Sequence, residues 1–270
     1  MKELKYNIKY LYHKKELYLS VLLLLLISLL HVFLSIQYCL SLNQVYEEFY
    51  SGEYQFILYN VNVNFQGLTM LLIPIICSMI LSDASFIENK LRISNILYLR
   101  INQNKNIIIR LILCIVLTFI ICFLCFLFNY IILTIIFGSG NFATFNQDVS
   151  FHLGYLSDFF LDNIRINNPV LFVLLINVCV SFIYGLLSGL SYSISLFLKN
   201  RIVIYFVPLL FLIITELLFS MIKSFNISFM TVLQPFSKLN LSTYFICVFI
   251  LIFIILVLTI IKIRKKDILI

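Results

Sequence analysis

Charged residues are scarce in this chain of 270 residues, and tryptophan is absent. Asp, Glu, Lys and Arg together make up 11% of the sequence, whereas 62% of the residues are hydrophobic. A soluble domain has about 25% charged and about 45–50% apolar residues, so this composition excludes a soluble fold. In place of Trp, 27 Phe and 16 Tyr provide aromatic side chains for the membrane interfaces. The sequence therefore predicts an all-α polytopic membrane protein.

Motifs for nucleotide or metal chemistry are also missing. No Gly-x-x-x-x-Gly-Lys-Ser/Thr segment is present, which excludes nucleotide binding through a P-loop, and no His-Glu-x-x-His segment occurs. The sequence therefore predicts no enzyme, no metal site and no bound cofactor. The seven Cys, including Cys122 and Cys125 in one apolar run, are interpreted as small apolar side chains. The N-terminus lacks the pattern of a cleaved signal peptide, so we expect none to be removed.

Apolar runs divide the chain, interpreted as one transmembrane domain over residues 1–270, into six predicted spans. About 20 apolar residues are needed to cross a bilayer. Residues 223–242, before the last span, are too apolar for an ordinary loop, and we expect re-entrant helices that dip into the outer leaflet. The predicted spans are residues 18–40, 65–82, 107–137, 170–198, 202–222 and 243–261.

Basic residues concentrate on one predicted side of the membrane. Of the 19 Lys and Arg, 16 fall in the two termini and the two inner loops, and 3 fall in the outer segments. The positive-inside rule then predicts that the N- and C-termini are both cytoplasmic. Because Ile, Asn and Lys are abundant, the composition is typical of a low-GC bacterial genome. The predicted location is therefore the bacterial cytoplasmic membrane.

Residues 2–16 have the pattern of an amphipathic interfacial helix. Leu4, Ile8 and Leu11 share one helical stripe. We expect this helix to lie on the cytoplasmic leaflet with its lysines on anionic headgroups, and the alternative is a disordered basic tail. The lysines are Lys2, Lys5, Lys9, Lys14 and Lys15.

The stretch from Asp83 to Arg110, between the second and third spans, combines five basic residues with apolar residues at roughly helical spacing. This pattern favours a short amphipathic helix that docks onto a cytoplasmic protein. The alternative is a solvated connector that rests on lipid headgroups. The residues assigned to the docking helix are Phe86, Glu88, Arg92, Ile93, Ile96, Leu97 and Arg100.

Small residues recur at every fourth position of the fourth span, at Ser181, Gly185, Gly189 and Ser193. A stripe of this kind lets another helix approach closely. We expect it to face a helix of the same subunit or of a second subunit.

Two polar residues within the spans have more than one interpretation. Glu216, in the outer half of the fifth span, either pairs with Lys223 or Lys238 as an anchor or faces a transport path. His31, in the first span, either packs against a neighbouring helix or has a function of its own.

The pattern of the whole chain resembles the permease subunit of ABC-2 type transporters. The shared features are an amphipathic N-terminal helix, six spans, a cytoplasmic coupling helix between spans two and three, and a dipping segment before span six. Locally, Glu88, the apolar run 93–99, the polar residues 102–105 and Arg110 match the coupling-helix pattern of that family. The chain departs from the pattern at residues 90–91, where the family has Gly-Thr, and at Arg100, where it has Pro.

The resemblance implies a permease without its own motor. A separate ABC ATPase would bind ATP and Mg²⁺ and contact the stretch from Asp83 to Arg110. A second permease subunit, identical or homologous, would complete the transport path, and no nucleic acid is expected as a partner. The implied function is export of a hydrophobic or amphipathic substrate, such as an antimicrobial peptide, a bacteriocin or a drug. Two alternatives stay open: a membrane assembly or sensor protein that transports nothing, and an ion-coupled secondary carrier.

Overall fold

In the computed structural model, the described residues form helices joined by turns, and no strand occurs among them. These residues are 2–41, 52, 56–59, 63–90, 102–138, 161, 164, 167–198, 200–221, 229–233 and 241–267. The prediction of an all-α protein is therefore confirmed. In chain order the elements are α1 (Lys2–Tyr12), α2 (Lys15–Ser41), the 3-10 turn η2 (Ile57–Tyr59), α3 (Val63–Met79), α4 (Ala84–Lys90), α6 (Gln103–Phe137), α8 (Pro169–Ser195), α9 (Arg201–Met221), α10 (Phe229–Leu233) and α11 (Leu241–Asp267).

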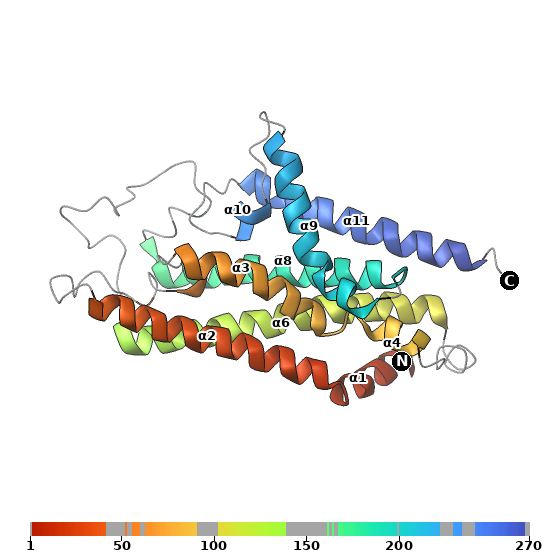
Figure 1. Ribbon diagram of the computed structural model, residues 1–270, viewed down its shortest axis with the longest axis horizontal. Coiled ribbons are helices and arrows are strands. Elements are labelled where there is room, and N and C mark those ends of the chain that lie inside the picture. The colour runs from red at the N-terminus through yellow and green to blue at the C-terminus, as the bar shows by residue number, and fades with distance from the viewer. Residues whose placement is uncertain are drawn as a thin grey trace.

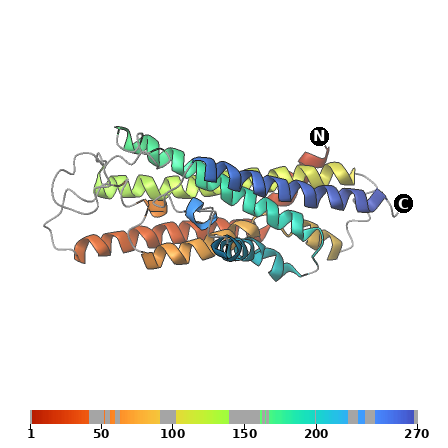
Figure 2. The same ribbon diagram turned by 90° about the horizontal axis from the view of Figure 1, so that it is seen from above.

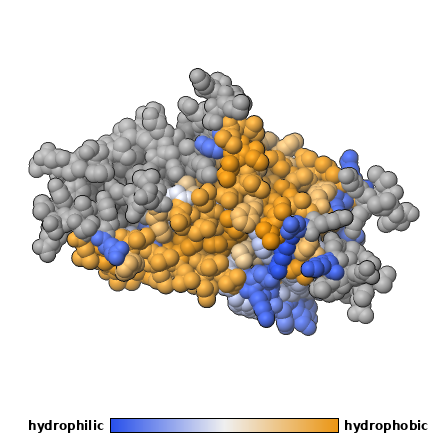
Figure 3. Space-filling model, in the orientation of Figure 1, coloured by the Kyte–Doolittle hydropathy of each residue, from blue (hydrophilic) through white to orange (hydrophobic). Residues whose placement is uncertain are grey.

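Five helices, α2, α6, α8, α9 and α11, are long and apolar enough to cross a membrane. Their outward sides carry many exposed Leu, Ile, Val and Phe side chains, and a broad hydrophobic surface covers the bundle in Figure 3. These features support a multi-pass membrane protein. The apolar part of α3 is shorter, from Gly67 to Met79, and Pro74 lies inside this helix without ending it. A sixth span and the assignment of the two membrane sides stay predictions.

Helices α6 and α8 form the centre of the bundle (Figures 1 and 2). With 35 residues, α6 is about 50 Å long. It begins after Asn102, whose side-chain oxygen accepts hydrogen bonds from the backbone N–H groups of Asn104 and Lys105. It ends at Gly138, whose φ of 75° favours glycine. Helices α3, α9 and α11 pack on α8, while α2 packs on α6 and α3.

Helix α1 meets α2 at a bend and lies against the start of α6. In Figures 1 and 2, α1 and the last turns of α11 lie at the same end of the bundle. Helix α9 rises steeply out of the bundle, and the short helix α10 packs beside it. The buried ring of Phe229 in α10 packs on Phe211 and Phe219 of α9, at centroid distances of 5.3 and 6.4 Å. Residues 223–228 and 234–240 of the predicted re-entrant segment lie outside the described residues, and residues 241–242 belong to α11.

Candidate functional site

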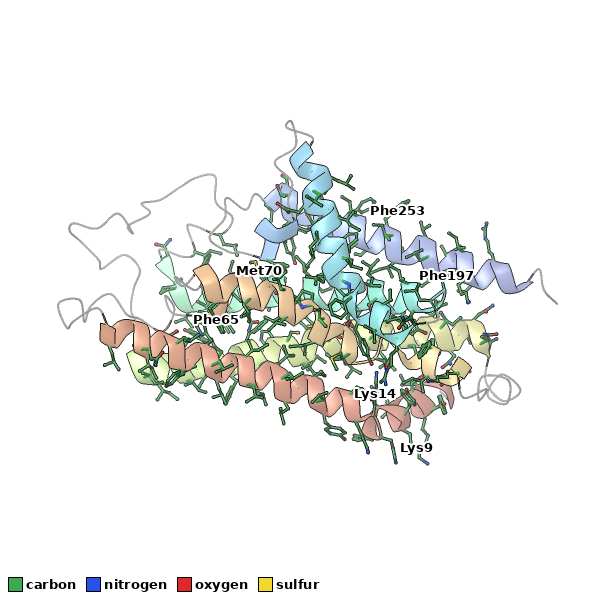
Figure 4. The ribbon with its side chains drawn as sticks, in the orientation of Figure 1. Lys9, Lys14, Phe65, Met70, Phe197 and Phe253 are labelled. Atoms are coloured by element: carbon green, nitrogen blue, oxygen red, sulfur yellow. The ribbon has the colours of Figure 1, made fainter. Side chains whose placement is uncertain are left out.

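Buried charged side chains gather at the end of the bundle where α1, α4 and the starts of α2, α6 and α9 meet. They form two adjoining groups, an Arg110 cluster and an Asp83 cluster. In Figure 4, Lys14 points into this region, whereas Lys9 points away from it. Because an unpaired buried charge is strongly destabilising, the partners of each charge decide what the region can do.

The Arg110 cluster (Tyr6, Asn7, Glu88, Asn106 and Arg110) joins α1, α4 and α6. The Arg110 side chain is almost completely buried, and its two terminal nitrogens bind the two carboxylate oxygens of Glu88, with Nη1 at 2.6 Å from Oε2. Its Nε donates to Oδ1 of Asn7 at 2.6 Å. A bidentate pair with a further charge-assisted hydrogen bond is among the strongest polar contacts in proteins. Glu88 of α4 is therefore held firmly against α6.

Helix α1 enters this cluster through its polar side. Asn7 Nδ2 donates to Asn106 Oδ1 at 2.8 Å, and the Tyr6 hydroxyl donates to Glu88 Oε1 at 3.0 Å. Burial and the nearby Glu88 charge raise the pKa of Tyr6 to about 12, so its hydroxyl keeps its proton at neutral pH. The ring of Tyr6 also lies 5.9 Å from the guanidinium carbon of Arg110. Helix α1 is thus tied to the same ion pair as α4.

The Asp83 cluster (Lys14, Glu16, Asp83, Arg201 and Tyr205) joins α2, the α3–α4 turn and α9. Asp83 is fully buried, and its Oδ1 pairs with Lys14 Nζ. Its Oδ2 accepts hydrogen bonds from Arg201 Nε at 2.7 Å and from the Tyr205 hydroxyl at 2.6 Å. Arg201 also pairs with Glu16. Two cations face two carboxylates, so the cluster is electrically balanced.

Acid should weaken the Asp83 cluster. Burial raises the pKa of Asp83, but Lys14, Tyr205 and Arg201 together hold it below the ordinary value of 3.8. The stability that the carboxylate contributes is therefore fully present above pH 3.8 and is lost as the pH falls through its lower folded pKa. We expect Asp83→Asn to be less stable than the parent by roughly 2–3 kcal/mol at neutral pH. Thermal unfolding in detergent should show this difference narrowing below about pH 4, and an unchanged difference would contradict the ion pairing.

These two clusters fix α4 at both ends. Asp83 immediately precedes the helix, and Glu88 lies in its last turn. Phe86 is half-buried between them. The Glu88 carboxylate is occupied by Arg110, so it holds α4 in place rather than presenting charge to a partner. The other residues assigned to the docking helix, Arg92, Ile93, Ile96, Leu97 and Arg100, lie outside the described residues.

Comparison with known proteins identifies no relative. No protein-family model, curated protein or solved structure matches the chain. The interpretation of the site therefore rests on its own geometry.

Sequence reasoning included Glu88 and Arg110 in the docking stretch but did not pair them, and it missed Asn7 and Tyr205. The sequence pattern that could have found them is a polar residue on a helical stripe that is otherwise apolar. Asn7, for example, lies on the same stripe as Leu11.

Lys14 is not where the sequence predicts it. The sequence predicts that it lies on lipid headgroups with the other N-terminal lysines, but the structure buries it against Asp83. The reason is local. Helix α1 ends at Tyr12, the chain turns before α2 begins at Lys15, and this turn directs Lys14 inward. Leu11 is buried as well, whereas Leu4 and Ile8 are exposed.

The small-residue stripe of α8 is buried, and its two glycines lie against α6 of the same chain. A Cβ atom on Gly185 would lie 2.8 Å from the backbone oxygen of Ile115. A Cβ atom on Gly189 would lie 2.7 Å from the side-chain atom Cγ1 of the same residue, Ile115. Ser181 and Ser193 are buried too, and each donates within α8, to Asn177 Oδ1 at 3.0 Å and Gly189 O at 2.9 Å.

Gly185→Ala should therefore destabilise the protein by about 1–3 kcal/mol, since the new methyl group meets backbone that cannot move aside easily. Gly67→Ala is the matched control, because no atom lies within 4 Å of a Cβ there. Alanine favours a helix over glycine by up to about 1 kcal/mol, so this variant should be neutral or stabilised. Unfolding of both variants in detergent checks the expectation, and equal stability would mean that α6 and α8 are not packed this closely.

The structure shows the contacts that decide between the two interpretations of His31, but not those that decide between the two interpretations of Glu216. His31 is buried, and its Nδ1 lies 3.2 Å from Nδ2 of Asn129, which also donates to Ser28 O at 2.9 Å. This contact between α2 and α6 supports the packing interpretation of His31. Glu216 is partly buried on α9. Its predicted partners, Lys223 and Lys238, lie outside the described residues, so both interpretations of Glu216 stay predictions.

Proposed function

We propose that this chain is the permease subunit of an ATP-driven exporter of the ABC-2 type in the bacterial cytoplasmic membrane. A separate ABC ATPase binds ATP and Mg²⁺ and docks on the stretch from Asp83 to Arg110. A second permease subunit completes the transport path, and both termini lie in the cytoplasm. The substrate class is a hydrophobic or amphipathic molecule, such as an antimicrobial peptide or a drug.

The observation that carries this proposal is the fixing of α4 at both ends. A permease without a motor must receive force at a docking segment and pass it to its spans. Helix α4 contains the first residues assigned to the predicted docking helix, and the others follow it in the sequence. Helix α4 is joined to α6 through Arg110, and the residue before it, Asp83, is joined to α9 through Arg201. Separating one of the buried pairs costs several kcal/mol, so a displacement of α4 is transmitted to these helices instead of being absorbed in a loop.

The same clusters argue against an ion-coupled carrier. Such a carrier needs a carboxylate that gains and loses its charge during transport. Asp83 and Glu88 are buried, but each is paired with cations at one end of the bundle. Their geometry suits a permanent structural charge, so neither of them supplies the carboxylate that a carrier needs.

Transport by inside-out membrane vesicles tests the proposal, with a fluorescent cationic amphipathic peptide and a hydrophobic dye as probes. The permease should move at least one probe inward when ATP is added, and a protonophore should leave this uptake unchanged. Uptake that the protonophore abolishes would identify a carrier instead. An assembly or sensor protein should give no uptake above that of vesicles lacking the chain.

A further inference from the structure

Pro208 lies inside α9 and interrupts the backbone hydrogen bonds of this helix, which continues past it to Met221. Because proline has no N–H group, the carbonyl oxygen of Ile204, one turn earlier, loses the donor that it would have in a regular helix. Pro208 therefore separates a first half of α9, residues 201–207, from a second half, residues 209–221. The helix rises out of the bundle in Figure 1.

A serine of α8 replaces the missing donor. The Ser191 hydroxyl donates to Ile204 O at 2.5 Å, and both residues are fully buried. The Ser78 hydroxyl of α3 lies 2.9 Å from the next carbonyl oxygen, Tyr205 O, although its single proton also faces Ile75 O at 2.6 Å. Serine is one of the residues that satisfy a carbonyl group freed by proline in a membrane helix. The interruption at Pro208 is thus accommodated without leaving Ile204 O unsatisfied.

The first half of α9 is anchored to the bundle. Arg201 and Tyr205 each donate to the buried carboxylate of Asp83, at 2.7 and 2.6 Å. Ile204 and Val207 are buried as well. Hydrogen bonds to a charged group are stronger than those between neutral groups, so moving this half would be costly.

The second half of α9 has fewer contacts with the bundle. Among residues 209–219, all of which the structure describes, only Leu212 is buried. The rings of Phe211 and Phe219 pack on Phe229 of the short helix α10. The exposed apolar residues of this half are Leu210, Ile213, Ile214, Leu217 and Leu218. This half of the helix is therefore free of the polar contacts that anchor the first half to Asp83.

We propose that Pro208 is a hinge, about which the second half of α9 swings together with α10 while the first half stays fixed on Asp83. A bend at proline breaks no helical hydrogen bond at that point, because the bond is already missing. Ser191 and Ile204 both lie on the anchored side of the hinge, so the hydroxyl satisfies the carbonyl oxygen in both positions of the helix. This inference depends on contacts within the chain and not on the exporter proposal.

The test measures distances in the purified full chain in lipid nanodiscs by pulsed electron paramagnetic resonance. Spin labels on genetically encoded ketone side chains at Leu218 and Phe253 would report the second half of α9 against α11, and the native cysteines would stay in place. Both positions are exposed. The parent should give a broad distance distribution or two distances. Pro208→Ala restores the N–H donor and should narrow the distribution by at least roughly twofold.

The control pair is Ile202 with Phe253, because Ile202 is exposed on the anchored half of α9. This pair should give a narrow distribution in the parent and in Pro208→Ala. Equal widths for the two pairs in the parent would overturn the hinge, whether or not the variant folds. A folded Pro208→Ala variant that keeps the broad distribution of the parent would overturn it as well.

Thermal unfolding in detergent tests the part played by Ser191. Ser191→Ala removes the hydroxyl donor from Ile204 O and should lower the unfolding temperature by roughly 3–8 °C. In the Pro208→Ala background the backbone supplies a donor, so the loss should be smaller. Ser193→Ala is the matched control, because the Ser193 hydroxyl donates within α8 and its loss should be the same in both backgrounds. Equal losses for Ser191→Ala in both backgrounds would show that this hydroxyl does not compensate for Pro208, and the proposal would be wrong.

Discussion

Glu88→Leu should lower the free energy of unfolding by about 3–5 kcal/mol, because it leaves the buried guanidinium of Arg110 without its counter-ion. Arg110→Met should have an effect of similar size, since it leaves the buried carboxylate of Glu88 without its counter-ion. The double variant should recover a large part of the loss, because an apolar pair replaces an ion pair and no unpaired charge remains. Its remaining deficit should be about 1–3 kcal/mol, because Asn7 loses the donor to its side-chain oxygen and Tyr6 loses the acceptor of its hydroxyl.

Denaturant unfolding of the detergent-solubilised protein measures all four members of this cycle. Lys105→Met is the control on the same helix, because Lys105 is exposed and its replacement should change stability by less than about 0.5 kcal/mol. Losses that simply add in the double variant would contradict the pairing of Glu88 with Arg110. Single variants as stable as the parent would show that the region is open to water.

Under the proposed function, Ile93→Asp/Ile96→Asp should detach the proposed ATPase partner while leaving this chain folded. Burying each isoleucine at a docking interface contributes roughly 1.5–3 kcal/mol, so losing both should weaken the complex by at least roughly 100-fold. Both residues lie beyond α4, and the ion pairs that hold α4 involve neither of them. The measurement is the amount of ATPase that elutes with the tagged permease, together with the size of the eluted complex.

The matched control for this variant is Ile93→Leu/Ile96→Leu, which keeps both positions apolar and close to their original volume. It should bind the ATPase like the parent. A complex that survives the Asp substitutions would show that the docking surface lies elsewhere in the chain. Misfolding is recognised separately, because a misfolded permease would also show a changed thermal unfolding profile without any partner.

The helices could be predicted from sequence because their signal is local. Apolar runs such as the one that becomes α6 leave few alternatives in a membrane protein, and the stripe containing Gly185 marks a close helix contact by spacing alone. The contact of Gly185 with Ile115 nevertheless required the structure, since a small residue does not specify its neighbour.

The ion pairs could not be predicted because they join residues far apart in the sequence. Asp83 and Arg201 are separated by 118 positions, and their contact depends on how α3, α4 and α9 pack. Lys14 illustrates the same limit. Its position among exposed lysines is typical of a membrane-surface contact, and only the turn between α1 and α2 directs it inward.

The most direct test of the proposed function is the identity of the proteins that co-purify with the full chain. A tagged copy would be extracted from its native membrane in mild detergent and its bound partners identified by mass spectrometry. A motor-dependent permease should retain an ABC ATPase in a fixed ratio, and the eluted complex should hydrolyse ATP. A stable, folded chain that retains no ATP-hydrolysing partner, and whose probe uptake continues without ATP, would contradict the account.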